Sequence, residues 1–245
     1  MSKTIGILGG MGPEAAAYFF KLVVGHTKAE TDQQHLKVLV HSDPLIPNRT
    51  EAVLGTGPSP VPNLEAGIRS LLQAGADLIV MPCITAHHFI PEVREKLDFH
   101  FIDMVEVSAA WAAETIPSLK KAGLLSSPGT LRSGLFEKAF GRRGVDIILP
   151  DPSIQDRLNE AVFGQRGIKA GYKTGPARES VVSVARMLAA QGAEAVVAGC
   201  TEIPLVLREE DIPVPLIDPM TIAALACIRE AGGQIRDRSA LKDIP

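Results

Sequence analysis

Short apolar runs alternate along the chain with longer segments in which apolar positions have helical spacing. Residues 4–8, 37–42 and 79–83 have the length of strands, and each contains a short apolar run. A Gly-rich loop follows the first run, and Pro13 with Glu14 then favours the start of a helix, because both residue types are preferred in a first turn. This alternation of strand and helix predicts an α/β fold with mostly parallel sheets and right-handed crossovers.

The segment from Asp43 to Pro62 interrupts this alternation. It contains Pro44, Pro47, Pro58, Pro60 and Pro62. So many prolines predict a loop without regular structure, and a loop of this length is often functional, for example as a lid. A helix from about residue 63 to 74 is expected next, with Gly75 in a favoured C-terminal capping position.

The second half of the chain repeats the landmarks of the first at a nearly constant offset. Gly6 corresponds to Gly123 and Cys83 to Cys200, each 117 residues apart (123 − 6 and 200 − 83). The Phe-Ile-Asp of residues 101–103 corresponds to Leu-Ile-Asp of residues 216–218, with an offset of 115 (218 − 103). Agreement of several landmarks over half the chain indicates an internal duplication.

The duplication predicts two similar α/β domains with mostly parallel sheets, related by a pseudo-dyad. Residues 1–115 form the half that carries Cys83, and residues 116–245 form the half that carries Cys200. The last helix, about residues 220–231, is available to pack back on the first half. Ligands bind beyond the carboxyl ends of parallel strands, so the expected active site is the cleft between the two domains.

Composition and charge narrow the class of protein. The formal net charge is −3, which gives no basic surplus for nucleic acid or an anionic membrane. The sequence has no run of about 18 apolar residues, so we expect no membrane span. The N-terminus runs directly into the first strand-like segment, so we expect no signal peptide. Three cysteines in a long chain are no disulfide framework, and they fit a reducing, cytoplasmic location. Cys227 lies in an apolar helical pattern and is expected in the core, and no Cys/His spacing resembles a zinc site.

Cys83 and Cys200 each end an apolar run and are each followed by polar residues. Two thiols at equivalent positions of a repeat are better explained by chemistry than by core packing. Two acid–base groups on opposite faces of a substrate are what inversion at carbon requires, since one thiolate removes a proton while the other thiol delivers one. A thiol pKa of about 8.5 needs only a modest decrease to give thiolate at neutral pH, and the second thiol must stay protonated.

Three segments together resemble one known family. They are Gly-Ile-Leu-Gly-Gly-Met-Gly-Pro-Glu-Ala at residues 6–15, Met-Pro-Cys-Ile-Thr-Ala-His at residues 81–87 and Gly-Cys-Thr-Glu-Ile at residues 199–203. In this order they resemble the cofactor-independent aspartate/glutamate racemases over nearly the whole chain. The resemblance implies a two-domain α/β fold, usually a homodimer, an acidic amino acid as substrate, and Cys83 with Cys200 as the catalytic pair. It implies neither pyridoxal phosphate nor a metal.

The resemblance also implies substrate-binding positions, each of which has an ordinary structural alternative. Met11 lies in the Gly-rich loop that contacts substrate in the family, where a nucleotide phosphate loop is the less favoured interpretation. Arg49 corresponds to a carboxylate ligand on the Pro-rich loop, a role that suits a guanidinium fork, and its alternative is a solvated surface residue. Lys169 lies among glycines where the family carries a substrate-binding lysine, and a surface charge is equally expected.

The residues that follow the two thiols are further candidates. The backbone N–H of Ile84 and the hydroxyls of Thr85 and Thr201 suit a carboxylate, although the hydroxyls also suit helix capping. Glu202 suits an ammonium group or the adjacent thiol, with a helix-start role as its alternative. For His87, a supporting or surface role is favoured over direct polarisation of a thiol.

Ile84 keeps other functions open. The family usually has asparagine directly after the first cysteine, where the amide binds the backbone of the amino acid, and an isoleucine side chain has no such group. One alternative is therefore a related isomerase or decarboxylase of carboxylic acids without an α-amino group, on the same scaffold. The other is a non-catalytic protein that binds a small acid. Turnover of a free amino acid would separate the racemase from both.

Overall fold

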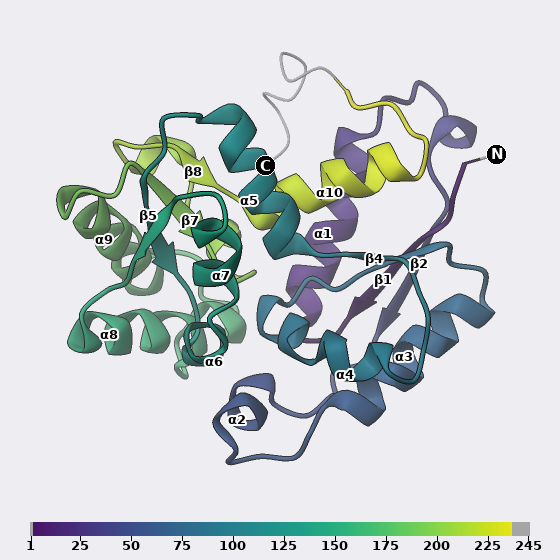
Figure 1. Cartoon of the computed structure of the whole chain (residues 1–245), viewed down its shortest axis with the longest axis horizontal. Helices are drawn as coiled ribbons and strands as arrows, with labels where there is room; N and C mark the ends of the chain where they lie inside the picture. Colours follow the sequence, from purple (N-terminus) through teal and green to yellow (C-terminus); the bar gives the residue numbers. More distant parts are fainter. Residues whose placement is uncertain (1, 237–245) are drawn as a thin grey trace. The chain divides into compact units, whose positions relative to one another are not determined.

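The computed structural model, which describes residues 2–236, contains two four-stranded parallel sheets (Figure 1). The strands of the first sheet are in the order β2-β1-β3-β4. They are β1 (Ile5–Gly9), β2 (Val38–Ser42), β3 (Leu78–Val80) and β4 (Phe101–Ile102). The strands of the second sheet are in the order β6-β5-β7-β8. They are β5 (Lys121–Leu125), β6 (Asp146–Ile148), β7 (Ala195–Ala198) and β8 (Leu216–Ile217).

Helices connect the strands of each sheet. Those that precede the second sheet are α1 (Pro13–His26), η1 (Asp32–Gln34), α2 (Arg49–Leu54), α3 (Val61–Gln73), η2 (Ile84–Phe89), α4 (Ile90–Arg94) and α5 (Met104–Thr115), where η denotes a 3-10 helix. Those that follow are α6 (Pro128–Ser133), α7 (Leu135–Gly141), α8 (Pro152–Phe163), η3 (Ile168–Ala170), α9 (Pro176–Ala190), η4 (Ile203–Leu205), η5 (Glu209–Asp211) and α10 (Pro219–Glu230). None of the helices within residues 2–236 is both long enough and apolar enough to cross a membrane.

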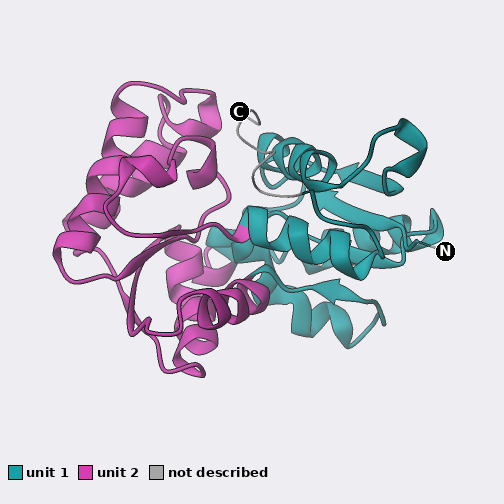
Figure 2. Cartoon of the chain, turned by 90° about the horizontal axis from the view of Figure 1, so that it is seen from above, with its two compact units in different colours: residues 1–52, 57–104, 220–245 teal, residues 53–56, 105–219 magenta. Residues whose placement is uncertain are grey.

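The chain forms two compact units, which Figure 2 colours separately. Unit 1 contains the residues up to Ala52, Gly57–Met104 and the residues from Met220 onward. Unit 2 contains Val53–Thr56 and Val105–Pro219. Helix α5, which precedes the sequence-based boundary at residues 115 and 116, is thus almost entirely in unit 2, whereas most of α10 is in unit 1.

The strand registers confirm the predicted duplication and the two-sheet α/β fold. Ile5 pairs with Leu78 in the first sheet, and Ala122 pairs with Ala195 in the second, so both partners shift by 117 residues (122 − 5 and 195 − 78). Ile102 on β4 and Ile217 on β8 differ by 115 (217 − 102), the same slip that the sequence shows. The central strands β1, β3 and β7 are buried at every position, as expected for parallel sheets covered on both faces.

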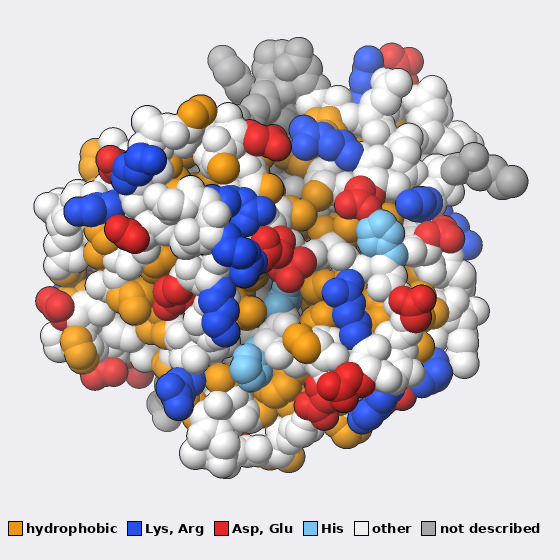
Figure 3. Space-filling view, in the orientation of Figure 1, with side chains coloured by type: hydrophobic (Ala, Val, Ile, Leu, Met, Phe, Trp, Pro, Cys, Tyr) orange, Lys and Arg blue, Asp and Glu red, His pale blue; other side chains and the backbone are white. Residues whose placement is uncertain are grey.

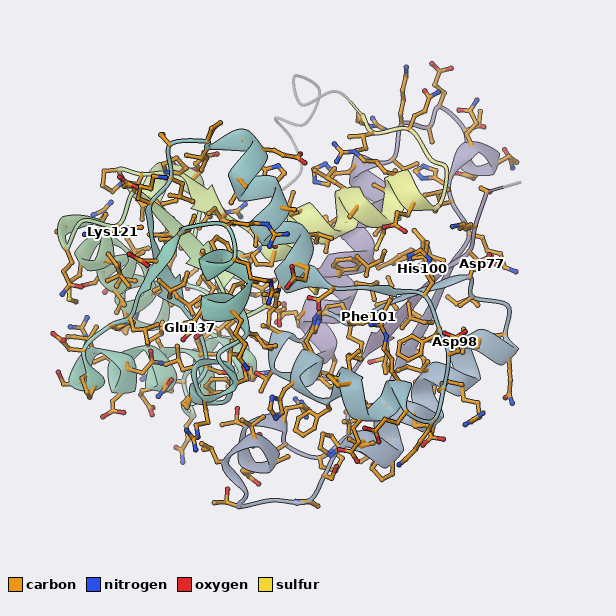
Figure 4. All side chains as sticks on the ribbon, viewed as in Figure 1. Asp77, Asp98, His100, Phe101, Lys121 and Glu137 are labelled. Carbon is orange, nitrogen blue, oxygen red and sulfur yellow. The ribbon has the colours of Figure 1, made fainter. Side chains whose placement is uncertain are left out.

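An acidic side chain in each unit binds the start of the first central strand. In unit 1, Asp77 accepts a hydrogen bond from the backbone N–H of Thr4 at 2.7 Å (Asp77 is labelled in Figure 4). In unit 2, Glu194 accepts from the N–H groups of Lys120 at 2.6 Å and Lys121 at 3.1 Å. The two backbone hydrogen bonds lower the pKa of Glu194 below its usual value.

Replacing Glu194 by glutamine is expected to remove part of the acid sensitivity of folding. A carboxyl whose pKa is lowered in the folded state adds stability above its usual pKa of 4.5, and this contribution is lost as the pH falls through the lowered value. Chemical denaturation of both proteins over a pH series measures the effect, with exposed Glu95→Gln as the control. Equal pH dependence in the Glu194→Gln variant and the native chain would contradict the assignment.

The Pro-rich segment was wrongly predicted to lack regular structure, because it contains helix α2. Asn48 caps this helix, since its Oδ1 accepts from the N–H of Thr50 at 3.0 Å and its Nδ2 donates to Glu51 Oε1 at 2.9 Å. The prolines lie on either side of residues 49–54, so they do not oppose the helix. Helix α3 also begins earlier than expected, at Val61, because proline is tolerated in a first turn.

Helix α10 and the residues after it are tied to unit 1. Lys3 N donates to Ala231 O at 2.9 Å, Thr27 forms an antiparallel bridge with Ile235, and His100 pairs with Glu230 at 2.6 Å (His100 is labelled in Figure 4). Cys227 of α10 is 0% exposed, which confirms its predicted core position. Burial and the nearby Glu230 carboxylate raise the pKa of its thiol.

Candidate active site

The two candidate catalytic thiols occupy the same place in their respective units. Cys83 follows β3 and Cys200 follows β7, at the carboxyl end of a central strand of each sheet. The same turn follows each thiol, because Ala86 N donates to Cys83 O at 3.1 Å and Ile203 N donates to Cys200 O at 2.9 Å. Both side chains are buried, with 6% of Cys83 and 9% of Cys200 exposed. These strand ends are where parallel sheets bind ligands.

In unit 1 the Gly-rich loop after β1 lies against the start of the Pro-rich segment. Gly10 has φ of +97°, and a Cβ atom there would be 2.2 Å from the backbone oxygen of Asp43. Asp43 N also donates to Gly9 O at 3.3 Å. Only glycine allows both this conformation and this approach, so the sequence holds the two segments together beside Met11.

Arg49, at the start of α2, fastens the same two segments. Its Nη1 donates to the carbonyl oxygens of Ile46 at 2.9 Å and Pro47 at 2.8 Å, and its Nη2 donates to Met11 O at 2.9 Å. The buried Nε has no hydrogen-bond partner among the described residues. Arg49 is therefore not the solvated surface residue of the alternative interpretation, and its Nε–H is left to bind an acceptor.

His87 supports the turn that carries Cys83. The side chain is 3% exposed, with Nδ1 3.3 Å from Asp103 Oδ1 and Nε2 3.2 Å from Met81 O. The ring also packs edge-on against Phe101 at 4.9 Å between centroids (Phe101 is labelled in Figure 4). A ring held on three sides fixes the backbone next to Cys83, which excludes the surface role.

Ile84 and Thr85 are the first residues of η2 and are also buried, at 2% and 8% exposed. The Ile84 side chain offers neither a donor nor an acceptor. Met11, Arg49, Cys83, Ile84 and Thr85 are thus the predicted site residues found in unit 1, at the ends of β1 and β3 and at the start of α2.

In unit 2 the carboxylate of Glu202 connects the remaining candidates. Its Oε2 accepts from Cys200 Sγ at 3.2 Å and from Thr201 Oγ1 at 3.3 Å. Its Oε1 pairs with Lys169 Nζ at 2.8 Å, and only 5% of the Glu202 side chain is exposed. Lys169 is also 5.8 Å from the centroid of the Phe163 ring. These contacts exclude the simple surface charge considered for Lys169 and give Glu202 more than a helix-start role.

This arrangement determines the resting state of Cys200. Burial, and secondly the negative charge of Glu202, raise the pKa of the Cys200 thiol well above its usual value, and the charge of Lys169 only partly offsets this. Cys200 therefore rests as a thiol that donates to Glu202. In chemical terms it is poised as a proton donor.

The sequence did not reveal two further polar residues at the same end of the second sheet, Ser126 and Gln155. Ser126 directly follows β5 and corresponds to Gly9 in the repeat (126 − 9 = 117), a signal that was available. Gln155 lies in the second turn of α8, and no motif marks it. Within residues 2–236, no three His, Cys, Asp or Glu side chains form a cluster that could hold a metal ion.

Comparison with known proteins shows the family to which the chain belongs. The sequence pattern of the Asp/Glu/Hydantoin racemase family matches residues 8–227. The chain belongs to this family. The membership confirms the resemblance seen in the sequence and the assignment to the isomerases.

Three individual proteins were compared with this chain, and two of them match it over nearly its whole length. The Picrophilus torridus aspartate racemase structure superposes with a TM-score of 0.86 and 30% identity, over 99% of this chain and 100% of that chain. The broad specificity amino-acid racemase RacX of Bacillus subtilis is 24% identical, over 91% of this chain and 96% of its own. The structure of a glutamate racemase from Francisella tularensis in complex with D-glutamate shares the fold, with a TM-score of 0.68 and 16% identity over 94% of this chain and 82% of that chain.

Proposed function

We propose that this protein is a cofactor-independent racemase of an acidic amino acid, with Cys83 and Cys200 as its two acid–base groups. The observation that carries the proposal is the duplicated thiol. In each repeat a cysteine follows a central strand, each cysteine is followed by the same turn, and both lie within the matched family segment. Racemisation transfers a proton on each of the two faces of one carbon, and a duplicated thiol supplies one acid–base group for each face.

The proposed reaction balances with no further reagent. The thiolate of one cysteine takes the α-proton, so that an S–H bond forms as the C–H bond breaks. The thiol of the other cysteine then gives its proton to the opposite face of the planar carbanion. Because burial and Glu202 raise the pKa of Cys200, we assign Cys200 as the proton donor and Cys83 as the base in the direction that starts from the resting state.

Two cations support an acidic substrate. Among the described residues the buried Nε–H of Arg49 has no partner, and a guanidinium N–H suits a carboxylate. Lys169 supplies a second positive charge, which Glu202 holds in place. We propose further contacts to the substrate from Met11, Thr85, Thr201 and the backbone N–H of Ile84. The Picrophilus torridus relative is named an aspartate racemase, which makes aspartate the first substrate to test.

Solvent exchange at the α-carbon tests the proposal. Purified protein is incubated in D2O, without added cofactor, with L- and D-aspartate, L- and D-glutamate and a wider panel of amino acids. We expect the α-proton signal of both enantiomers of one amino acid to disappear from the NMR spectrum. A preparation shown to be folded that exchanges no amino acid of the panel would refute the proposal.

Ile84 favours one second candidate, an isomerase or decarboxylase that acts on a carboxylic acid without an α-amino group. Its aliphatic side chain gives no hydrogen bond to an amino-acid backbone next to Cys83. Exchange or decarboxylation of dicarboxylic acids, together with silence toward amino acids, would establish this candidate instead.

The predictions about partners have their own tests. Lys and Arg side chains lie among Asp and Glu side chains on the face in view in Figure 3, in keeping with a small-molecule substrate rather than nucleic acid or membrane. The homodimer stays a prediction that analytical ultracentrifugation tests, and the cytoplasmic location stays a prediction that cell fractionation tests.

A further inference from the structure

Two buried polar atoms near Cys200 have no hydrogen-bond partner within residues 2–236. They are the hydroxyl oxygen of Ser126 and the amide oxygen of Gln155. Ser126 is 2% exposed and Gln155 is 8% exposed. A buried polar atom without a partner is costly to the folded chain, so such atoms in a native protein point to a bound group that completes them.

Both atoms belong to the carboxyl end of the second sheet. β5 ends at Leu125, which pairs with Ala198 on the parallel neighbour β7, so Ser126 lies beside Gly199, the residue before Cys200. Neighbouring strands are about 4.8 Å apart. Gly199 permits this approach, because a Cβ atom on it would lie 2.5 Å from Leu124 Cδ1 and 3.2 Å from the carbonyl oxygen of Leu125.

The neighbours of Gln155 determine which way its amide faces. Its Nε2 donates to Ser126 O at 2.9 Å and to Asn159 Oδ1 at 2.8 Å. Both of these partners are acceptors, so both N–H groups are used and a flipped amide would oppose oxygen to oxygen. What remains is Oε1, which can only accept a hydrogen bond.

Gln155 Oε1 selects a hydrogen-bond donor, not a carboxylate, and the Ser126 hydroxyl is compatible with that choice. Gln155 Oε1 repels any group that carries only acceptors, and the Ser126 hydroxyl can accept from the same donor. The carboxylate of Glu202 is already engaged by Lys169 and Cys200. An α-ammonium group carries three N–H donors, and the aliphatic side chain of Ile84 offers it no acceptor.

We propose that Ser126 Oγ and Gln155 Oε1 accept hydrogen bonds from the α-ammonium group of the substrate. This inference rests on the proposed function, because it assigns the amino-group contact for the same amino acid. It makes the pair specificity-determining, since they distinguish an amino acid from the corresponding acid without an amino group.

The test compares binding of aspartate with succinate and of glutamate with glutarate, by isothermal titration calorimetry. Native protein is expected to prefer the amino acid of the accepted pair. Ser126→Ala is expected to reduce this preference about tenfold, the usual effect of one hydrogen bond to a charged group. Its melting temperature without ligand is expected to stay the same or rise, because the lost hydroxyl has no partner within residues 2–236.

Ser133→Ala is the matched control, because Ser133 is a buried serine of the adjoining helix α6. Its hydroxyl donates to Thr130 O at 2.6 Å. The control is expected to lower the melting temperature by about 2–4 °C and to leave the preference intact. Opposite results in the two variants separate a ligand contact from a structural one.

Gln155→Met provides a second variant that removes Oε1 at nearly constant length, and we expect the same loss of preference. Native protein that binds succinate as tightly as aspartate, and glutarate as tightly as glutamate, would overturn the inference. So would an unchanged preference in Ser126→Ala, which would assign its hydroxyl to a structural water. If the native protein exchanges an amino acid in D2O, these outcomes refute the ammonium contact and leave the proposed racemase function intact. Binding of none of the four acids would overturn the ammonium contact and the proposed function together.

Discussion

Replacing either Cys83 or Cys200 by alanine is expected to abolish racemisation, with a loss of at least about 10³-fold in kcat/KM for both directions. Each variant lacks one of the two groups that transfer a proton, and a general acid or base contributes about 10²- to 10⁴-fold. The rate of change of optical rotation, measured from each enantiomer separately, gives the loss. Retention of racemisation by either variant would refute two-thiol chemistry.

Exchange in D2O adds a sharper expectation for the same variants. A variant with one thiol left is expected to exchange the α-proton of one enantiomer at most, with retention, and the two variants are expected to differ in which enantiomer they exchange. Cys227→Ala is the control, since this cysteine is also buried but lies within helix α10 and not after a strand. It is expected to cost about 1 kcal/mol of stability through the small cavity it leaves, with racemisation unchanged.

Changes to Lys169 and Glu202 are expected to move the pKa of Cys200 in opposite directions. Glu202→Gln removes a negative charge that faces the thiol and is expected to lower this pKa. Lys169→Met removes a positive charge and is expected to raise it further. Ultraviolet absorbance of the thiolate over a pH series, in a chain that also carries Cys83→Ser and Cys227→Ala, reads Cys200 alone.

Lys169→Met is also expected to destabilise the chain, because it leaves the Glu202 carboxylate buried without its cation. A fully buried broken pair costs about 3–5 kcal/mol, and we expect about 1–3 kcal/mol here because 28% of the Lys169 side chain is exposed. Lys96→Met, at an exposed lysine, is the control for the charge change. Shifts of the Cys200 pKa in the same direction for Glu202→Gln and Lys169→Met would contradict the assigned geometry.

The fold was predictable because the two halves of the sequence repeat the same order of strands and landmark residues. The offset of 117 residues recurs in the strand registers, and buried parallel strands read as uninterrupted apolar runs. Helix α2 was not predictable from proline content, because it is a short helix that depends on its Asn48 cap. Neither was the grouping of α5 with unit 2, since a helix between two similar halves carries no sign of the side on which it packs.

The positions of the thiols were predictable, and their surroundings were not. Cys83 and Cys200 are marked by their place at strand ends, which is a local property. The ion pair of Lys169 with Glu202 and the hydrogen bond from Arg49 to Met11 O depend on contacts between segments that are distant along the chain. Gln155 is one polar position among several on an amphipathic helix, and only its burial and unpaired oxygen distinguish it.

The return of α10 to unit 1 sets an order for folding during synthesis. Ribosomes release the chain from its N-terminus, and domains generally fold as they emerge. The segment Val105–Pro219, nearly all of unit 2, has then emerged before the residues that complete unit 1. Until α10 and Ala231 emerge, Lys3 before β1 lacks its partner Ala231, and His100 before β4 lacks its partner Glu230. The half that begins the chain is therefore the last to be finished, and a nascent chain stalled before α10 would present that half to chaperones.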